Sequence, residues 1–298
     1  GSVSKNYTFK GKIDKAYINF PNSYKLENLN ADVVYGKSSQ EKSDTLKITI
    51  KKGLISDLKL LESFINIRFE DNKKKIKSSI HTSGELNLKE IENFFSLLGV
   101  EIKNLNIISL RSNLITNVEF DVDKKFRIKN TTYSINGNIN KLQFKTKKET
   151  LIKNFLPSFN SSIIVKDTKI AFSSIKEEKN FKLDGEIKFS KNFEKFKYSQ
   201  TFNKKNKKYN IKISTSLNES SLNLSQLNYK KKVGQIAQID LNVDLLLGKY
   251  FLLRSLDYSS NKNKIILNKI KLNNNFEIID LSDLKVKTYI KNVKNNDF

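Results

Sequence analysis

The chain has 298 residues, of which 38% are hydrophobic, and it includes 20 Phe and 11 Tyr. This apolar content excludes a disordered polymer, so the chain folds. The formal net charge is +24, but only four of the 55 basic residues are Arg. Arg is the residue that binds phosphates and base edges with two parallel hydrogen bonds, so we do not expect nucleic acid as a partner, and an anionic membrane surface suits the charge better.

Residue types that are absent or rare exclude several kinds of chemistry. The chain has no Cys, which removes disulfides, thiolate metal sites and a Cys nucleophile, and His81 is its single His. One His builds neither a His-rich metal site nor a triad without a placed Ser and Asp. We therefore expect no metal, no cofactor, no catalytic residues and no enzymatic activity.

The chain also lacks Met, and Gly1-Ser2 resembles a cloning remnant, so we interpret it as a segment of a longer protein. No apolar run approaches the roughly 18 residues that a membrane-spanning helix needs. We expect any membrane anchor to lie outside this segment.

The first predicted strand begins at Tyr7, and its alternating pattern continues to Phe20. Its spacing of an aromatic residue, Gly and Ile recurs around Gly137 and Gly185, and more weakly around Gly84. A Gly inside a strand marks a bulge or a close approach of another backbone, so we predict a repeated supersecondary unit.

The next segment, Leu58 to Phe69, alternates at its end, but the pair Leu60-Leu61 breaks the period of two, which predicts a bulged strand. Asp71 to Lys73 then reverses the chain into another strand.

Two short helices are predicted between the strands. The first follows a capping-box spacing of Asn87 and Glu90, runs from Leu88 to Leu98 and ends at Gly99. The second runs from Thr146 to Leu156 and ends at Pro157.

Beyond Pro157 the pattern predicts strands to the end of the chain, and the clearest of them lie between Tyr209 and Leu246. The expected strands are Ile163–Ile175, Phe181–Phe189, Phe193–Phe202, Tyr209–Leu217, Ser221–Tyr229, Gln238–Leu245, Tyr250–Tyr258, Ile265–Leu272 and Leu284–Ile290. Short polar breaks separate them, so successive strands pair antiparallel as a meander with one apolar and one polar face.

These elements predict a mainly β fold: a long, curled antiparallel meander, or β-groove, with two short helices. We divide it into a first groove-repeat region at residues 1–145, with one inserted helix, and a second at 146–298 that continues the first. Two short helices shield little of so long a sheet. Its apolar face therefore closes on itself as a sandwich or barrel, or remains as a trough filled by an apolar guest such as acyl chains.

The chain resembles the AsmA-like family of bacterial envelope proteins, in particular its TamB-related members. The resemblance rests on the Gly-bearing strands, the helix at Leu88–Leu98, the run from Ile239 to Leu245, and the closing segments Asp280–Ile290 and Asn295–Phe298. The resemblance implies an elongated β-groove in the periplasm, as part of an inner-membrane-anchored protein. It further implies transport of phospholipid toward the outer membrane, with membrane or envelope proteins at the ends of the sheet. It carries over no catalytic residue.

The leading hypothesis is thus a non-enzymatic conduit segment whose apolar strand positions hold phospholipid acyl chains. The residues predicted to contact lipid are Ile211, Ile213, Leu222, Leu224, Ile239, Leu241, Val243, Ile266 and Ile270. The alternative hypothesis is a structural or adhesive β-sandwich or solenoid with a sealed core.

Overall fold

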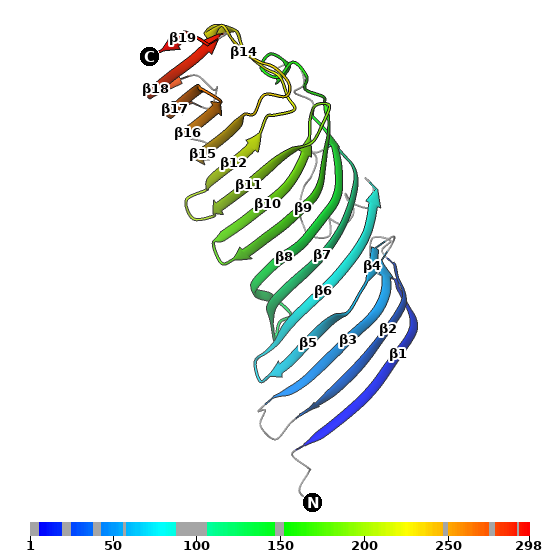
Figure 1. Cartoon of the computed structure of the whole chain (residues 1–298). Helices are drawn as coiled ribbons and strands as arrows, with labels where there is room; N and C mark the ends of the chain where they lie inside the picture. Colours follow the sequence, from blue (N-terminus) through cyan, green and yellow to red (C-terminus); the bar gives the residue numbers. More distant parts are fainter. Residues whose placement is uncertain are drawn as a thin grey trace, which may run out of the picture. The chain divides into compact units, whose positions relative to one another are not determined.

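A computed structural model describes residues 6–19, 25–37, 43–55, 58–87, 106–146, 152–246, 250–273, 278–290 and 292–298 (Figure 1). Seventeen strands form one long antiparallel sheet and two more form a separate small sheet. The predicted mainly β fold with a long antiparallel meander is therefore confirmed.

The strands of the long sheet are β1 (Tyr7–Asn19), β2 (Lys25–Lys37), β3 (Asp44–Ile55), β4 (Leu58–Leu60), β5 (Ser63–Glu70), β6 (Lys73–Asn87), β7 (Asn106–Asp123), β8 (Ile128–Lys145), β9 (Ser162–Ile175), β10 (Glu178–Lys188), β11 (Glu194–Asn203), β12 (Lys208–Ser216), β15 (Gln238–Leu246), β16 (Tyr250–Ser260), β17 (Asn263–Leu272), β18 (Ile278–Ile290) and β19 (Val293–Asp297). The small sheet pairs β13 (Leu222–Leu224) with β14 (Tyr229–Lys231), and a 3₁₀ turn, η2 (Ser225–Leu227), joins them.

The chain divides into two compact units. The first contains Gly1–Glu101, Ser109–Ile139 and Phe172–Lys176, and the second contains Ile102–Ile108, Asn140–Ala171 and Glu177–Phe298. Strands β7, β8 and β9 contribute residues to both units. The proposed division between residues 145 and 146 stays a prediction.

Tight turns explain why successive strands pair antiparallel. Two-residue turns at Lys176-Glu177 and Asn261-Lys262 join β9 to β10 and β16 to β17. Lys176 has φ 51° and Asn261 has φ 52°, the positive values that two-residue hairpin turns require at their first central position. Connections this short cannot cross the sheet, so β10 lies beside β9 and β17 lies beside β16.

The bulge predicted at Leu60-Leu61 is confirmed. β4 and β5 continue one another along β3, but against β6 the pairing moves from Leu60 with Thr82 to Phe64 with Ser79. Four residues on one strand thus lie opposite three on the other.

The two predicted helices fall wholly or partly outside the described residues. The helix expected at Leu88–Leu98 lies outside them. Of the second, Ile152 and Lys153 are helical, and the amide of Leu156 donates to the carbonyl of Ile152 at 2.8 Å, as in an α-helical turn. Within the described ranges, no helix has the length and apolar character needed to cross a bilayer.

In the first unit, a cluster of buried side chains packs where β2, β3 and β4 meet. It consists of Leu26, Leu29, Ala31, Ile50 and Leu60. Burying such aliphatic side chains stabilises this corner by roughly 1.5–3 kcal/mol each.

The Gly residues that recur in the sequence pattern do not all have the same structural role. A Cβ on Gly137 would lie 2.1 Å from the carbonyl oxygen of Asn113, and a Cβ on Gly185 would lie 2.1 Å from Oγ1 and 2.6 Å from Cα of Thr168. At these two positions a neighbouring strand comes too close for a side chain. At Gly11, by contrast, a Cβ would meet no described atom within 4 Å.

This contrast predicts opposite outcomes for one substitution at two sites. Gly185→Ala forces β9 and β10 apart at the fully buried Thr168 and should lower the free energy of unfolding by about 1–3 kcal/mol. Gly11→Ala should change it by no more than about 0.5 kcal/mol, or raise it slightly. Urea denaturation of both variants measures the difference, and equal values would contradict the close approach at Gly185.

Candidate functional site

Seven strands of the second unit, β10, β11, β12 and β15 to β18, carry a continuous apolar face. Residues directly opposite one another in neighbouring strands point to the same face, so the pairing defines four rows of side chains that cross the strands. Row I is Leu183, Tyr198, Ile213, Leu241, Leu256, Leu267 and Leu284; row II is Gly185, Phe196, Thr215, Ile239, Tyr258, Ile265 and Val286. Row III is Phe181, Gln200, Ile211, Val243, Leu253, Ile270 and Leu281; row IV is Lys179, Phe202, Tyr209, Leu245, Phe251, Leu272 and Ile278.

A register shift keeps these rows apolar in β16, β17 and β18. Between β15 and β16 the pairing shifts by one residue after Asn242, which leaves Arg254 as the extra residue of a bulge. Lys269 lies at the corresponding position of β17 with φ 53°. Strict alternation would put Leu256 and Leu253 on opposite faces, and the bulge returns them to the same one.

Row II is covered by a segment inserted between β12 and β15. Residues 217–237, which include β13 and β14, pack with Leu156 and Phe159 over Tyr258, Ile265 and Val286 of this row. The hydroxyls of Tyr229 in the insert and Tyr258 in the sheet lie 2.9 Å apart. We refer to residues 217–237 as the cover.

The other rows become more exposed toward β18. Val243 in row III is 4% exposed, whereas Leu284, Leu281 and Ile278 at the β18 ends of rows I, III and IV are 38%, 47% and 65% exposed. The apolar face is thus sealed along row II and open at its β18 side.

A buried carboxylate fixes the cover to the sheet, and a buried lysine makes hydrogen bonds within the cover. The carboxylate of Glu194, at the start of β11, accepts hydrogen bonds from Ser216 Oγ at 2.9 Å and from the amides of Asn218 and Glu219 at 3.0 and 2.7 Å. Lys231 in β14 is 2% exposed and donates through Nζ to the carbonyl of Ser220 at 2.8 Å.

Burial lowers the pKa of Lys231, and the charges of Glu194 and Glu219 partly offset this effect. Glu194 therefore fixes the start of the cover to β11, and the buried Lys231 ties β14 to the backbone at Ser220 within the cover.

The structure brings six of the nine predicted lipid-contacting residues together. Ile211, Ile213, Ile239, Leu241, Val243 and Ile270 all lie in the four rows.

The other three lie elsewhere. Leu222 and Leu224 do not form a sheet strand between β12 and β15, because these two pair directly; both residues belong to the cover. Ile266 lies opposite Asp257 and Lys285 on the polar face. Strict alternation places Ile266 with Ile270 on the apolar face, but the bulge at Lys269 breaks that alternation.

A buried carboxylate supports the bulge from the polar face. Asp244 in β15 accepts hydrogen bonds from Arg254 Nε at 2.6 Å and Asn210 Nδ2 at 2.9 Å, and its carboxylate lies 3.0 Å from Lys208 Nζ. Burial acts to raise its pKa, but the hydrogen bonds from Arg254, Asn210 and Lys208 outweigh burial and lower the pKa to about 2.

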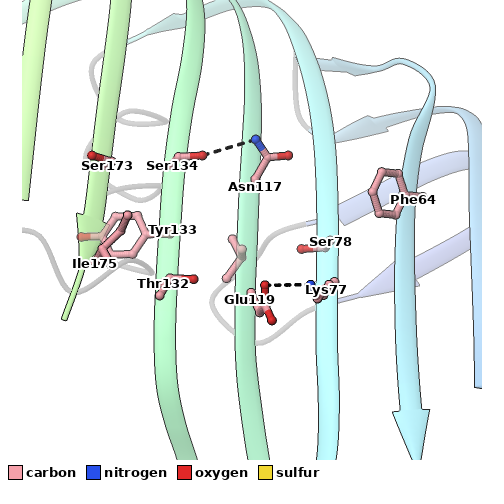
Figure 2. A pocket seen from close by; sticks show the side chains of 11 residues that line it. Phe64, Lys77, Ser78, Asn117, Glu119, Thr132, Tyr133, Ser134, Ser173 and Ile175 are labelled. Atoms are coloured by element: carbon pink, nitrogen blue, oxygen red, sulfur yellow. Dashed lines mark hydrogen bonds and ion pairs between the residues drawn. The ribbon is translucent and has the colours of Figure 1, made fainter.

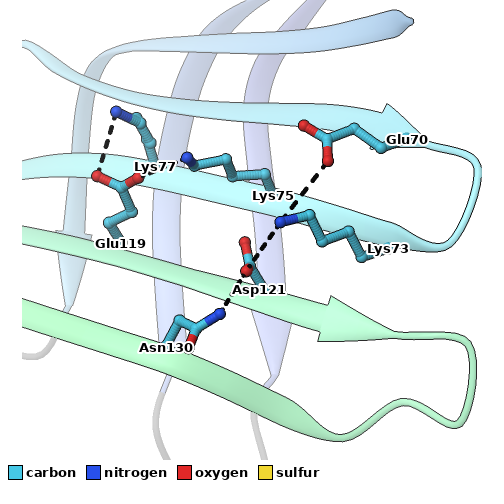
Figure 3. Close-up of polar contacts among 7 residues, drawn as sticks. All are labelled: Glu70, Lys73, Lys75, Lys77, Glu119, Asp121 and Asn130. Atoms are coloured by element: carbon cyan, nitrogen blue, oxygen red, sulfur yellow. Dashed lines mark hydrogen bonds and ion pairs between the residues drawn. The ribbon is translucent and has the colours of Figure 1, made fainter.

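In the first unit the polar face carries ion pairs across neighbouring strands (Figure 3). Lys73 in β6 donates to Asp121 in β7 at 3.1 Å, and Lys75 and Lys77 lie 3.2 and 3.1 Å from Glu119. The hydrogen bond from Lys77 lowers the pKa of Glu119.

Glu119 also borders an open depression of about 320 Å³ between Phe64 and Ile175 (Figure 2). A carboxylate paired with two lysines stays ionised at neutral pH and is poorly suited to general acid catalysis. The depression is shallow and open, and no group of three or more His, Asp or Glu side chains in the described ranges is placed to hold a metal ion.

Comparison of the chain with protein-family models, with curated proteins and with solved structures gave no match.

The attachment of the cover leads to a prediction about Glu194. Glu194→Ala leaves the amides of Asn218 and Glu219 without their acceptor and removes one of the two anions near Lys231, and should destabilise the cover by about 3 kcal/mol. Hydrogen exchange should accelerate in residues 217–237 more than in β15 and β16. Glu186→Ala is the control, because its ion pair with Lys166 is partly solvated and contributes at most about 1 kcal/mol. Unchanged exchange in the cover would show that Glu194 does not hold it.

Asp244 generates a prediction about pH. Because its folded pKa lies below the ordinary 3.8, its contribution to stability is present above about pH 4 and is lost as the pH falls toward 2. The contribution is about 1–2 kcal/mol after allowance for the solvated Lys208 and Arg254. Asp244→Asn should lower the free energy of unfolding by this amount at neutral pH, and the gap from the unmodified chain should shrink below pH 4. A gap that does not depend on pH would contradict this assignment.

Proposed function

We propose that the chain is a non-enzymatic segment of a lipid conduit, in which the apolar face of the second unit holds phospholipid acyl chains. The single observation that carries the proposal is the set of four apolar rows across seven strands, of which the cover packs mainly over row II. Exposed apolar surface of this extent in an aqueous compartment is normally occupied.

The dimensions of the rows suit acyl chains. Seven strands at about 4.8 Å spacing give each row a length of roughly 29 Å, which is comparable to the hydrocarbon thickness of a bilayer of about 30 Å. One row is therefore long enough for a fatty acyl chain from a single leaflet.

Binding of acyl chains by the rows is a passive process. Transfer of an acyl chain from water to the rows is favourable by roughly 0.8 kcal/mol per buried CH₂. Since aliphatic contacts have no preferred direction, a chain held by rows I and III can slide along them. No bond is made or broken, and no catalytic residue is needed.

Lipid head groups have cationic neighbours at one end of the strands. The turn between β11 and β12 contains the exposed Lys204, Lys205 and Lys207. It begins two residues after Phe202 of row IV, which stacks on Tyr209 with ring centroids 4.3 Å apart. Phosphate groups near these lysines leave the acyl chains directed toward the rows.

We infer the cellular location and the partners from the AsmA-like, TamB-related envelope proteins that the sequence resembles. We propose that the chain works in the periplasm as part of an inner-membrane-anchored protein, carries phospholipid between the inner and outer membranes and serves envelope assembly. Its partners are phospholipid acyl chains and membrane or envelope proteins at the ends of the sheet.

The second candidate is a structural or adhesive module with a sealed core. The cover favours this candidate along row II, where Phe196, Tyr258, Ile265 and Val286 are buried. Elsewhere the described ranges contain no second large sheet to pack on the first, only the two-stranded sheet of the cover. An environment-sensitive apolar dye separates the two candidates, because a sealed core excludes it and open rows bind it in stoichiometric amounts.

The proposal is tested by photo-crosslinking. A photoreactive phenylalanine derivative at Leu241 or Ile270, in rows I and III, should crosslink to phospholipid in membranes of expressing cells. The same group at Asn242 or Asn268 on the polar face of the same strands is the matched control and should give much less. Equal yields on both faces, or no lipid adduct at either, would refute the proposal.

Two substitutions provide a second test of the proposal. Leu284→Asp lies in row I at a position already 38% exposed, so it should leave the fold intact while introducing a charge among the acyl chains. Leu241→Asp introduces the same charge in the middle of that row. Mass spectrometry of the purified protein should find less co-purified phospholipid with each variant, and the circular dichroism spectrum reports whether the fold is kept.

A further inference from the structure

The turn between β7 and β8, in the first unit, presents an aromatic side chain to solvent. Phe126 is 78% exposed and has φ 57°, and Ile128 two residues later is 64% exposed. A left-handed conformation is unfavourable for a bulky side chain, and Gly or Asn would form the same turn at lower cost. Folding alone therefore does not explain Phe126.

Asp123 holds this turn in its conformation. Its carboxylate accepts hydrogen bonds from the amides of Lys125 and Arg127 at 2.9 and 3.0 Å and from Arg127 Nε at 2.8 Å, and Lys129 Nζ lies 3.1 Å away. The amide of Phe126 donates to the Asp123 carbonyl at 2.9 Å. The exposed ring thus projects from a turn with fixed geometry, as expected where strain is retained for function.

Cations surround the exposed ring. Lys124 and Lys125 are exposed within the turn, and the side chains of Arg127 and Lys129 are 62% and 52% exposed although they pair with Asp123.

The β5–β6 turn lies at the same end of the sheet (Figure 3) and adds a further cation. The ammonium group of Lys74 lies 5.5 Å from the centroid of Phe126 and 5.7 Å from that of Phe69.

We propose that this turn docks the first unit on an anionic membrane surface, with Phe126 and Ile128 inserted at the level of the head groups and acyl chain ends and the lysines beside lipid phosphates. Aromatic and aliphatic side chains combined with Lys and Arg are the side chains that bind such an interface. The complementary charge selects anionic over neutral lipid, and the exposed apolar side chains need hydrocarbon, which a soluble polyanion does not offer. This site goes beyond acyl-chain binding by the second unit and does not depend on it.

The test is flotation of the purified chain with vesicles of phosphatidylcholine alone and of phosphatidylcholine mixed with phosphatidylglycerol. Binding should require phosphatidylglycerol and weaken as salt is added. Phe126→Ser should weaken it about tenfold, whereas Phe64→Ser, a change of an exposed Phe on a strand of the same unit, should leave it unchanged. Phe126→Gly should raise the melting temperature and still lose binding, which excludes misfolding as the cause.

Charge variants complete the experiment. Lys124→Gln/Lys125→Gln should weaken binding about tenfold or more, and Lys10→Gln/Lys12→Gln, two exposed lysines of β1, should weaken it much less. Wild-type binding by Phe126→Ser, or equal loss with both lysine pairs, would overturn the proposal.

Leu241→Asp distinguishes the two proposed sites. Retained flotation supports docking by the turn. Flotation lost with Leu241→Asp and kept with Phe126→Ser would overturn the docking turn while leaving the acyl-chain proposal in place.

Discussion

Antiparallel pairing satisfies the backbone hydrogen bonds of the long sheet. It still leaves the strands of the second unit with one apolar face and one polar face. Each strand of the second unit directs one set of alternate side chains to the apolar rows and the other set to solvent, and the rows run unbroken because opposite residues share a face. Since apolar area in water is unfavourable at about 25 cal/mol per Å², this face must be covered. The cover, which Glu194 fixes to β11, meets that requirement along row II.

Polar interactions decide whether the rows stay intact. A one-residue slip in β16 would move Leu253 and Phe251 to the polar face, because side chains alternate with a period of two. The bulge at Arg254 absorbs the extra residue, and Asp244 binds the Arg254 guanidinium on the opposite face. Glu194 acts similarly at the cover, where it fixes the backbone at Asn218 and Glu219. In both places a buried carboxylate sets the backbone path on which the apolar packing depends.

Local alternation was sufficient to predict the fold class, the strands around Ile211 and Ile239, and the bulge after Leu60. It failed where the backbone departs from a period of two or where partners are distant in the sequence. Leu222 and Leu224 alternate like any strand, and nothing local shows that β12 pairs past them with β15. Ile266 was assigned to the wrong face because a bulge at Lys269 follows it. The hydrogen bonds of Glu194 join it to Asn218 and Glu219, which lie 24 and 25 positions away in the chain, and periodicity does not report such contacts.

The sequence also explains why the open rows are suited to a guest that moves. Rows I, III and IV are aliphatic or aromatic from β12 to β18, and their polar members, Lys179 and Gln200, lie only in β10 and β11. Apart from the hydroxyl of Tyr209, the side chains of these rows from β12 to β18 carry no hydrogen-bond donor or acceptor. Such a surface binds by area, so a hydrocarbon chain sliding along it would lose one contact as it gains the next. A directional polar group in the middle of a row would create a preferred position and a barrier on either side of it. The uniformity of these rows from β12 to β18 is the property that the proposed conduit requires.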